Sequence, residues 1–279
     1  NTSSMSLISS DKRVSPSNLW INKNTRSLYA VEYEPGYPIY EFVDKKSDMS
    51  KLLKGLLKAL PGHQVRILST TANNDAHIVI ALSDKNPGYY YLYDAKTKRL
   101  QYLLSAKNWI DPNKMAEVRP ISFKNREKIQ IDGYLTIPKG IEEKGMPLIV
   151  MPHGGPHGPR DWWTFDSDTQ MLSNNNLAVL QVNFRGSGGY GRSFEASGYR
   201  KWGTDIQNDI IDGVKDLIEQ GLVDKDNICI MGASFGGYSA LQSSIIEPDL
   251  FKCAIGVVGV YDLPMMFEEG DVQTRESGM

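Results

Sequence analysis

Hydrophobic and polar positions follow two different patterns along this 279-residue chain. Up to about residue 118, short runs rich in β-branched and aromatic residues alternate with turn-forming residues, a pattern that predicts β-strands. The predicted strands are residues 26–33, 64–71, 76–83, 89–94 and 99–104. Their spacing of about 10–12 residues suits sandwiches, barrels and propellers alike, so the pattern alone does not choose among these folds.

One segment in this half has a helical pattern instead. Residues 51–60 (KLLKGLLKAL) place leucines on one face and lysines on the other, and Pro61 and Gly62 end the run. A cationic amphipathic helix can lie on a membrane surface. Because this one is short, we expect it to pack on the β-rich half.

From about residue 119 onward, apolar runs alternate with helical patterns. The runs are residues 148–151, 177–182, 228–231 and 253–260. They are almost continuously apolar, as strands covered on both faces must be. Apolar positions from 206 to 218 repeat at helical spacing, and Thr204 with Gln207 suggests a capping box. The alternation predicts a mostly parallel sheet with helices on both faces, and hence two units in the chain.

Composition narrows the function only slightly. With 41% hydrophobic and 23% charged residues the chain should fold. A net charge of -2 gives no reason to expect a nucleic-acid partner. No run reaches the roughly 18 apolar residues of a membrane span. Cys229 and Cys253 lie in apolar runs, and we expect both to be buried free thiols.

The segment 228–240 carries the clearest chemical signal. Gly232, Ser234 and Gly236 form a G-x-S-x-G motif between a predicted strand and a predicted helix, which is where a nucleophile elbow presents its serine. Residues without side chains let strand and helix approach each other while the serine hydroxyl points into a cleft. The helix N-terminus adds positive potential where negative charge will develop. We expect Ser234 to be a nucleophile rather than part of a glycine-rich turn.

Two further glycine-containing segments follow predicted strands. Residues 153–156 (HGGP) occupy the position of an oxyanion loop of the HGGG type. His153 is a poor candidate for the general base, because in this architecture the base follows the nucleophile in sequence. His153 and His157 lack a third ligand, so we expect no metal and no cofactor. Residues 183–194 (NFRGSGGYGRSF) lack the lysine and order of a phosphate-binding loop, and we expect a mobile loop beside the active cleft.

These segments together resemble one family. HGGP at 153–156, NFRGSGGYG at 183–191, the helix after Trp202 and GASFGGY at 232–238 closely resemble the catalytic domain of prolyl oligopeptidase-type serine peptidases, of the acylaminoacyl-peptidase and dipeptidyl-aminopeptidase-like branch. The likeness spans roughly residues 119–265. It implies an α/β hydrolase fold over residues 119–279, preceded by the last blades of a β-propeller over residues 1–118.

The resemblance also implies roles for individual residues. Ser234 would attack the scissile carbonyl, and the backbone N–H groups of Phe235 and Gly155 would hold the oxyanion. We expect His153 and Tyr190 to contact the substrate. The expected partner is a short peptide, and the sequence leaves homo-oligomerisation and the cellular compartment open.

One feature departs from the family pattern. The family's catalytic Asp and His follow the nucleophile, but no histidine follows Ser234 here. Without a base, only the roughly 10³–10⁴-fold effect of oxyanion hole and binding remains. We therefore expect residues 1–279 to be an inactive piece, truncated at both ends, of an active peptidase. The alternatives are a carboxylesterase or lipase of the same fold and a non-catalytic scaffold that binds peptides.

Overall fold

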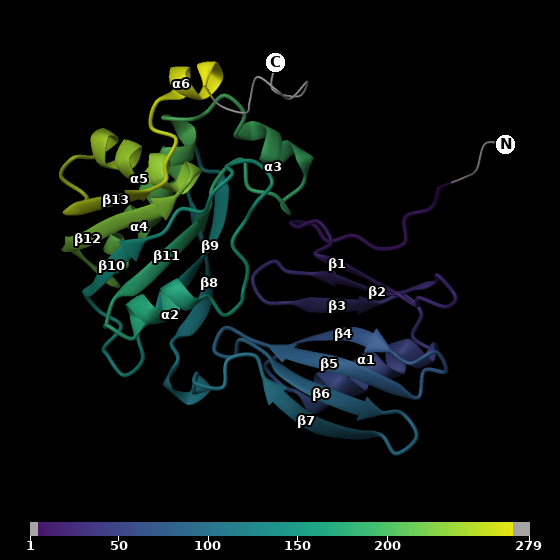
Figure 1. Cartoon of the computed structure of the whole chain (residues 1–279). Helices are drawn as coiled ribbons and strands as arrows, with labels where there is room; N and C mark the ends of the chain where they lie inside the picture. The colour runs from purple at the N-terminus through teal and green to yellow at the C-terminus, as the bar shows by residue number, and fades with distance from the viewer. Residues whose placement is uncertain (1–4, 270–279) are drawn as a thin grey trace.

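The computed structural model describes residues 5–269 and arranges the strands of this part in three sheets (Figure 1). The first is antiparallel and contains β1 (Asn18–Ile21), β2 (Leu28–Tyr33) and β3 (Ile39–Phe42). The second is an antiparallel meander of β4 (Gln64–Thr70), β5 (Ala76–Leu82), β6 (Tyr89–Asp94) and β7 (Arg99–Ser105). All five strands predicted in this half are present. The four-residue strands β1 and β3 were not predicted.

The predicted amphipathic helix is α1 (Asp48–Ala59). The Ser47 hydroxyl accepts a hydrogen bond from the amide of Ser50 and so caps the N-terminus. Leu53 packs with the first sheet and Leu56 with the second, and both side chains are buried. The expectation that this helix packs on the β-rich half is confirmed.

The third sheet is mixed. It contains β8 (Glu117–Lys124), β9 (Gln130–Ile137), β10 (Met146–Val150), β11 (Ala178–Asn183), β12 (Val223–Ala233) and β13 (Cys253–Val257). The order of the strands in the sheet is β13-β12-β10-β11-β9-β8. A short 3₁₀ helix, Pro112–Lys114, precedes β8 in the chain. The four strands from β13 to β11 are parallel, and β9 and β8 add an antiparallel edge. A large apolar core lies between this sheet and its helices.

Helices cover both faces of this sheet. They are α2 (Ser167–Ser173), α3 (Arg192–Ser197), α4 (Asp205–Glu219), α5 (Phe235–Ile246) and α6 (Leu263–Glu268). In the sheet, β11 lies on one side of β10, whereas β12 and β13 lie on its other side. Because connections between parallel strands are right-handed, this order puts α2 on one face of the sheet and α4 and α5 on the other. α4 and α5 contact each other accordingly. None of the helices within residues 5–269 has the length and hydropathy of a membrane-spanning segment.

The expected capping box at the start of α4 is wrong. Thr204 is the N-cap residue, but its hydroxyl donates to the carbonyl of Lys201 rather than accepting from an amide of the helix. Gln207 accepts from the amide of Gly203 and donates to the hydroxyl of Ser239 on α5. This glutamine therefore joins α4 to α5 within the core.

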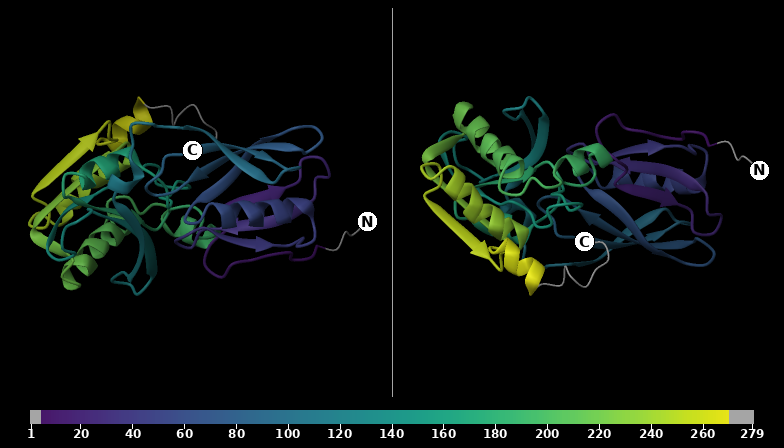
Figure 2. Two further views of the ribbon diagram at one scale, coloured as in Figure 1. Left: turned by 90° about the horizontal axis from the view of Figure 1, so that it is seen from below. Right: turned by 90° about the horizontal axis from the view of Figure 1, so that it is seen from above.

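The β-rich half lies beside one end of the mixed sheet (Figure 2). Glu34, one residue beyond β2, is 3% exposed and accepts hydrogen bonds from the Trp163 amide at 2.6 Å and the Tyr134 hydroxyl at 3.2 Å. Arg13 forms an ion pair with Asp132. Buried carboxylates are stable only when hydrogen-bonded, so Glu34 favours this arrangement of the two halves.

The expectation of two free thiols is wrong. Cys229 on β12 and Cys253 on β13 form a disulfide, with Cα atoms 4.7 Å apart. The two residues are direct register partners in neighbouring parallel strands. β13 also lies at the edge of the described sheet, so Cys253 is exposed rather than buried. Apolar neighbours in sequence indicated strands correctly, but the pairing depends on a register that the sequence does not show.

Removing this disulfide should lower the stability of the second half of the chain. The bond closes a loop with a sequence separation of 24, for which chain entropy gives about 3 kcal/mol. We expect the double variant Cys229→Ser, Cys253→Ser to lose about 2–4 kcal/mol in denaturant unfolding. Intact-mass measurement with and without reductant, after thiol alkylation, tests the bond itself. Equal alkylation of both cysteines before reduction would contradict it.

Candidate functional site

Ser234 lies at the turn between β12 and α5. β12 ends at Ala233 and α5 begins at Phe235, and Ser234 has φ 56° and ψ −125°. Such a conformation is strained for a residue with a side chain and clusters at functional sites. The Ser234 side chain is exposed. Its hydroxyl is therefore held outside the packing by the backbone, as the motif predicted.

Gly232 and Gly236 of the motif have to be glycines, because other backbone segments lie close to their Cα atoms. A side chain at Gly232 would meet the backbone of Gly236, the second residue of α5. A side chain at Gly236 would clash with the carbonyl oxygen of Pro152. Neither collision can be relieved by a side-chain rotation, because the obstacle is backbone in both cases. Strand, helix and the loop after β10 thus meet at Ser234.

The backbone around Ser234 leaves an amide available. The Ser234 amide donates to the Val257 carbonyl at 3.0 Å, and the Ser234 carbonyl accepts from Gly237 and Tyr238. Among the described residues, no oxygen accepts from the amide of Phe235, the first residue of α5. First-turn amides have no partner within their own helix and carry its positive partial charge. The Phe235 ring itself is buried against Trp202.

The HGGP segment lies against this turn. A Cβ built on Gly154 would lie 3.9 Å from the Cβ of Ser234. Gly155 is exposed with φ 123°, which favours glycine. No oxygen of the described residues accepts from the Gly155 amide either. Two amides from separate segments are therefore free of partners beside one exposed hydroxyl.

His153 is partly buried and contacts neighbouring groups on three sides. Its ring stacks on Phe184, with centroids 4.2 Å apart and planes at 19°. Its Nδ1 lies 2.8 Å from the Gly154 carbonyl oxygen, and its Nε2 lies 2.8 Å from the Ser187 hydroxyl. A carbonyl only accepts, so Nδ1 carries the proton and Nε2 accepts from Ser187. Both nitrogens are occupied, so His153 offers no free ring nitrogen to a substrate.

Acid should destabilise the fold through His153. Burial lowers the pKa of His153 to about 4, and the positive charge of Arg160 acts in the same direction, against the bond to Gly154. An unfolded histidine titrates near 6.5, so between about pH 6.5 and 4 the unfolded chain binds more protons. The free energy of unfolding should fall as the pH falls through this window. Denaturant unfolding at several pH values should show that the free energy of unfolding depends less steeply on pH in His153→Phe than in the wild type. Identical slopes for the two proteins would contradict the role given to His153.

The segment 183–191 is packed, so the expectation of a mobile loop is wrong. Residues 183–188 are all buried. The Arg185 guanidinium forms two 2.9 Å hydrogen bonds with the Asp209 carboxylate on α4. The Gly188 amide donates to the Pro159 carbonyl, and a Cβ on Gly188 would clash with the backbone of Gly158. The glycines allow two backbones to touch and do not confer freedom of movement.

Tyr190 belongs to the contact between the two halves. Its hydroxyl accepts a hydrogen bond from Asn183 at 2.8 Å, and its ring lies 4.4 Å from the Arg160 guanidinium. The ring also packs on a small cluster from the N-terminal half that includes Val14 and Tyr33. Burial raises the pKa of Tyr190 to about 12. The described contacts do not bring Tyr190 to Ser234.

Ser187, Arg185 and Asp209 were not singled out by the sequence. The first two lie within the NFRGSGGYG segment, whose glycines drew attention away from its polar residues. Asp209 lies on the buried face of α4, next to Ile210 of the apolar repeat. A charged residue on the buried face of an amphipathic helix is the signal that could have identified this pair.

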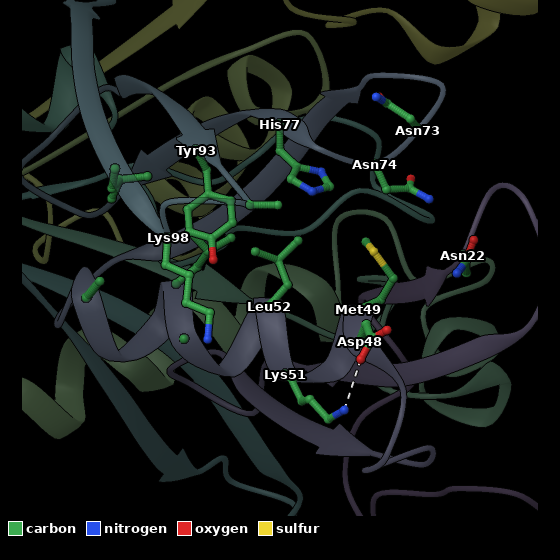
Figure 3. A pocket seen from close by; sticks show the side chains of 15 residues that line it. Asn22, Asp48, Met49, Lys51, Leu52, Asn73, Asn74, His77, Tyr93 and Lys98 are labelled. Atoms are coloured by element: carbon green, nitrogen blue, oxygen red, sulfur yellow. Dashed lines mark hydrogen bonds and ion pairs between the residues drawn. The ribbon is translucent and has the colours of Figure 1, made fainter.

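A cavity of about 990 Å³ lies elsewhere, between α1 and the second sheet (Figure 3). Leu52 and Gly55 of α1 line one side, and His77 and Tyr93 line the other. No serine or cysteine is among its lining residues. The His77 ring bonds the Thr70 hydroxyl at 3.0 Å. We place the candidate site at Ser234, because the cavity lacks a nucleophile.

A parallel sheet flanked by helices, with a strained serine between a central strand and the next helix, defines the α/β hydrolase class. Residues 163–278 match the family described as prolyl oligopeptidase family, Peptidase_S9. Over these residues the chain is similar to that family of peptidases.

Known proteins similar to the chain agree with this assignment. Dipeptidyl aminopeptidase BIII of Pseudoxanthomonas mexicana is 32% identical over 225 residues, which cover 78% of this chain and 32% of that protein. A puromycin-hydrolyzing peptidase of Mycobacterium tuberculosis has a TM-score of 0.61 at 26% identity, over 70% of this chain and 30% of that one. Acylaminoacyl peptidase of Pyrococcus horikoshii has a TM-score of 0.65 at 22% identity, over 92% and 39%. The chain spans about a third of the length of the curated relatives that it matches.

Proposed function

We propose that the protein is a serine-type peptidase that cleaves short peptides, with Ser234 as its nucleophile. The observation that carries this proposal is the exposed hydroxyl of Ser234 at φ 56°, between β12 and the N-terminus of α5. Oγ would lose its proton and bond to the carbonyl carbon of the substrate. The C–N bond would then break as the leaving amine takes up that proton, and water would later release the acyl group as a carboxylic acid and restore the hydroxyl.

The oxyanion of the intermediate would be held by the amides of Phe235 and Gly155. Both are without partners among the described residues, and they come from segments that meet at Ser234. Removing one donor of this kind typically costs about 3–4 kcal/mol of transition-state stabilisation. We assign the proton transfer to neither His153 nor His157, because Nε2 of His153 faces Ser187 and both histidines precede Ser234, whereas the base of this architecture follows the nucleophile.

We also propose that residues 1–118 are the last blades of a β-propeller and that residues 119–279 are hydrolase domain. The four-stranded meander β4–β7 has the composition of one blade. The likeness to acylaminoacyl peptidase, which extends over 92% of this chain, supports a common arrangement. A propeller beside the cleft would restrict substrates by size, which favours short peptides. The names of similar proteins, such as dipeptidyl aminopeptidase and acylamino-acid-releasing enzyme, agree with that class.

A fluorophosphonate probe tests the nucleophile directly. We expect the full-length protein to be labelled, with the adduct on the peptide that contains Ser234. Ser234→Ala should abolish this labelling, and Ser244→Ala is its matched control, which should be labelled like the wild type. Ser244 lies on α5, and its hydroxyl is bonded to the Leu241 carbonyl. Adducts only at other serines would contradict the proposal. Faster turnover of short-chain esters than of any peptide in a library would favour the carboxylesterase alternative.

A further inference from the structure

We propose that Ser187 is a positioning residue for catalysis: its hydroxyl fixes the ring of His153, and that ring fixes the peptide group whose N–H belongs to Gly155. The inference rests on the proposed function and deepens it. It assigns roles to the buried Ser187 and the partly buried His153, which neither contact the substrate nor transfer its proton.

The geometry of one peptide unit carries the argument. The Gly154 carbonyl and the Gly155 amide belong to the same peptide group, which is trans, so they point in opposite directions. His153 Nδ1 holds the carbonyl oxygen at 2.8 Å. Holding that oxygen fixes the rotation of the whole plane and therefore aims the N–H. Glycine on both sides of the bond would otherwise leave the plane free to rotate.

The tautomer of His153 makes Ser187 necessary. Nδ1 can hold the carbonyl only while it carries the proton, and then Nε2 must find a donor. The Ser187 hydroxyl, in a fully buried side chain 2.8 Å away, is that donor. Without it, the alternative tautomer would put a lone pair at Nδ1 against the carbonyl oxygen. The peptide plane would then lose its anchor.

Ser187 is itself held in place. Its amide donates to the Phe184 carbonyl at 3.0 Å, and Phe184 is the residue on which the His153 ring stacks. Arg185, between them, is anchored to Asp209 on α4. The segment 184–187, anchored to α4, thus determines the orientation of the Gly155 amide. This explains why a segment so rich in glycine is buried.

The test is Ser187→Ala in the full-length protein, with Ser243→Ala as its matched control. Ser243 is equally buried, and its hydroxyl has no partner among the described residues. For Ser187→Ala we expect kcat to fall about 10–100-fold with KM within about twofold, because a misaimed donor acts on the transition state. A peptidyl boronic acid, which forms a tetrahedral adduct, should lose affinity by a similar factor. Ser243→Ala should change none of these quantities.

Two further measurements separate positioning from general damage. ¹⁵N NMR of the histidine rings should show His153 protonated at Nδ1 in the wild type and a mixture of tautomers in Ser187→Ala. His153→Asn, whose amide can still donate near the Nδ1 position, should retain more activity than His153→Phe. These variants also decide the case if Ser187→Ala does not fold.

The experiments distinguish a failure of the proposed function from a failure of the positioning role of Ser187. If the wild type neither cleaves peptides nor reacts with the fluorophosphonate, the proposed function fails. If the wild type is active and Ser187→Ala keeps its kcat and the wild-type tautomer, only the positioning role fails. An increase in KM at constant kcat would likewise overturn it, because that change marks uniform substrate binding.

Discussion

Replacing Ser234 with alanine should lower kcat by about 10⁵–10⁶-fold and leave the fold intact. The hydroxyl is the atom that would bond to the substrate, and no other nucleophile lies at this turn. The amides of Phe235 and Gly155 should still bind the substrate carbonyl, so KM should change little. Single-turnover and steady-state hydrolysis of a fluorogenic dipeptide would measure both effects.

The backbone at position 234 makes the comparison with other residues informative. Alanine keeps a Cβ and tolerates the strained φ no worse than serine does, so stability should be unchanged within about 0.5 kcal/mol. Ser234→Cys would retain a nucleophile of similar size, but a thiol in place of the hydroxyl. Hydrolysis by Ser234→Ala within tenfold of the wild type would remove Ser234 from the mechanism. An unfolded Ser234→Ala protein would contradict the exposure of the side chain.

The sequence predicted the elements that have a repeating pattern. Residues 64–71 and the helix after Trp202 were found because β-branched alternation and helical spacing are local properties. β1 and β3 were missed because four residues are too few to show a period. β9 was not predicted as a strand, although seven of its eight residues are buried.

In the candidate site, too, some features could be predicted from the sequence and others could not. Ser234 and the HGGP segment were predictable, because tight turns demand glycine at fixed offsets. The contacts of His153 and the pairing of Cys229 with Cys253 were not, because both depend on which strands become neighbours. The family resemblance suggested that His153 contacts the substrate. Its contacts with Phe184 and Ser187 support the different role proposed above.

Replacing Asp209 with alanine should lower the free energy of unfolding by about 3–5 kcal/mol. The Asp209 carboxylate is fully buried and accepts from the guanidinium and amide of Arg185 and from the Asn125 side chain. Burial raises the pKa of Asp209, while its bonds to Arg185 oppose the rise. The alanine variant leaves the buried Arg185 cation without its main partner, with only the more exposed Glu127 and Asp205 beside it, and this under-compensated charge dominates the loss. Urea unfolding at pH 7 measures it.

Asp212 provides the matched control on the same helix. It forms an ion pair with Arg126 at 2.7 Å, but 42% of the Arg126 side chain is exposed, so water can replace the lost partner. Asp212→Ala should therefore cost no more than about 1 kcal/mol. Arg185→Met combined with Asp209→Leu removes both charges and should recover much of the stability lost in Asp209→Ala. Equal losses for Asp209→Ala and Asp212→Ala would show that burial does not govern these pairs, and the anchoring of the 183–191 segment by α4 would have no energetic basis.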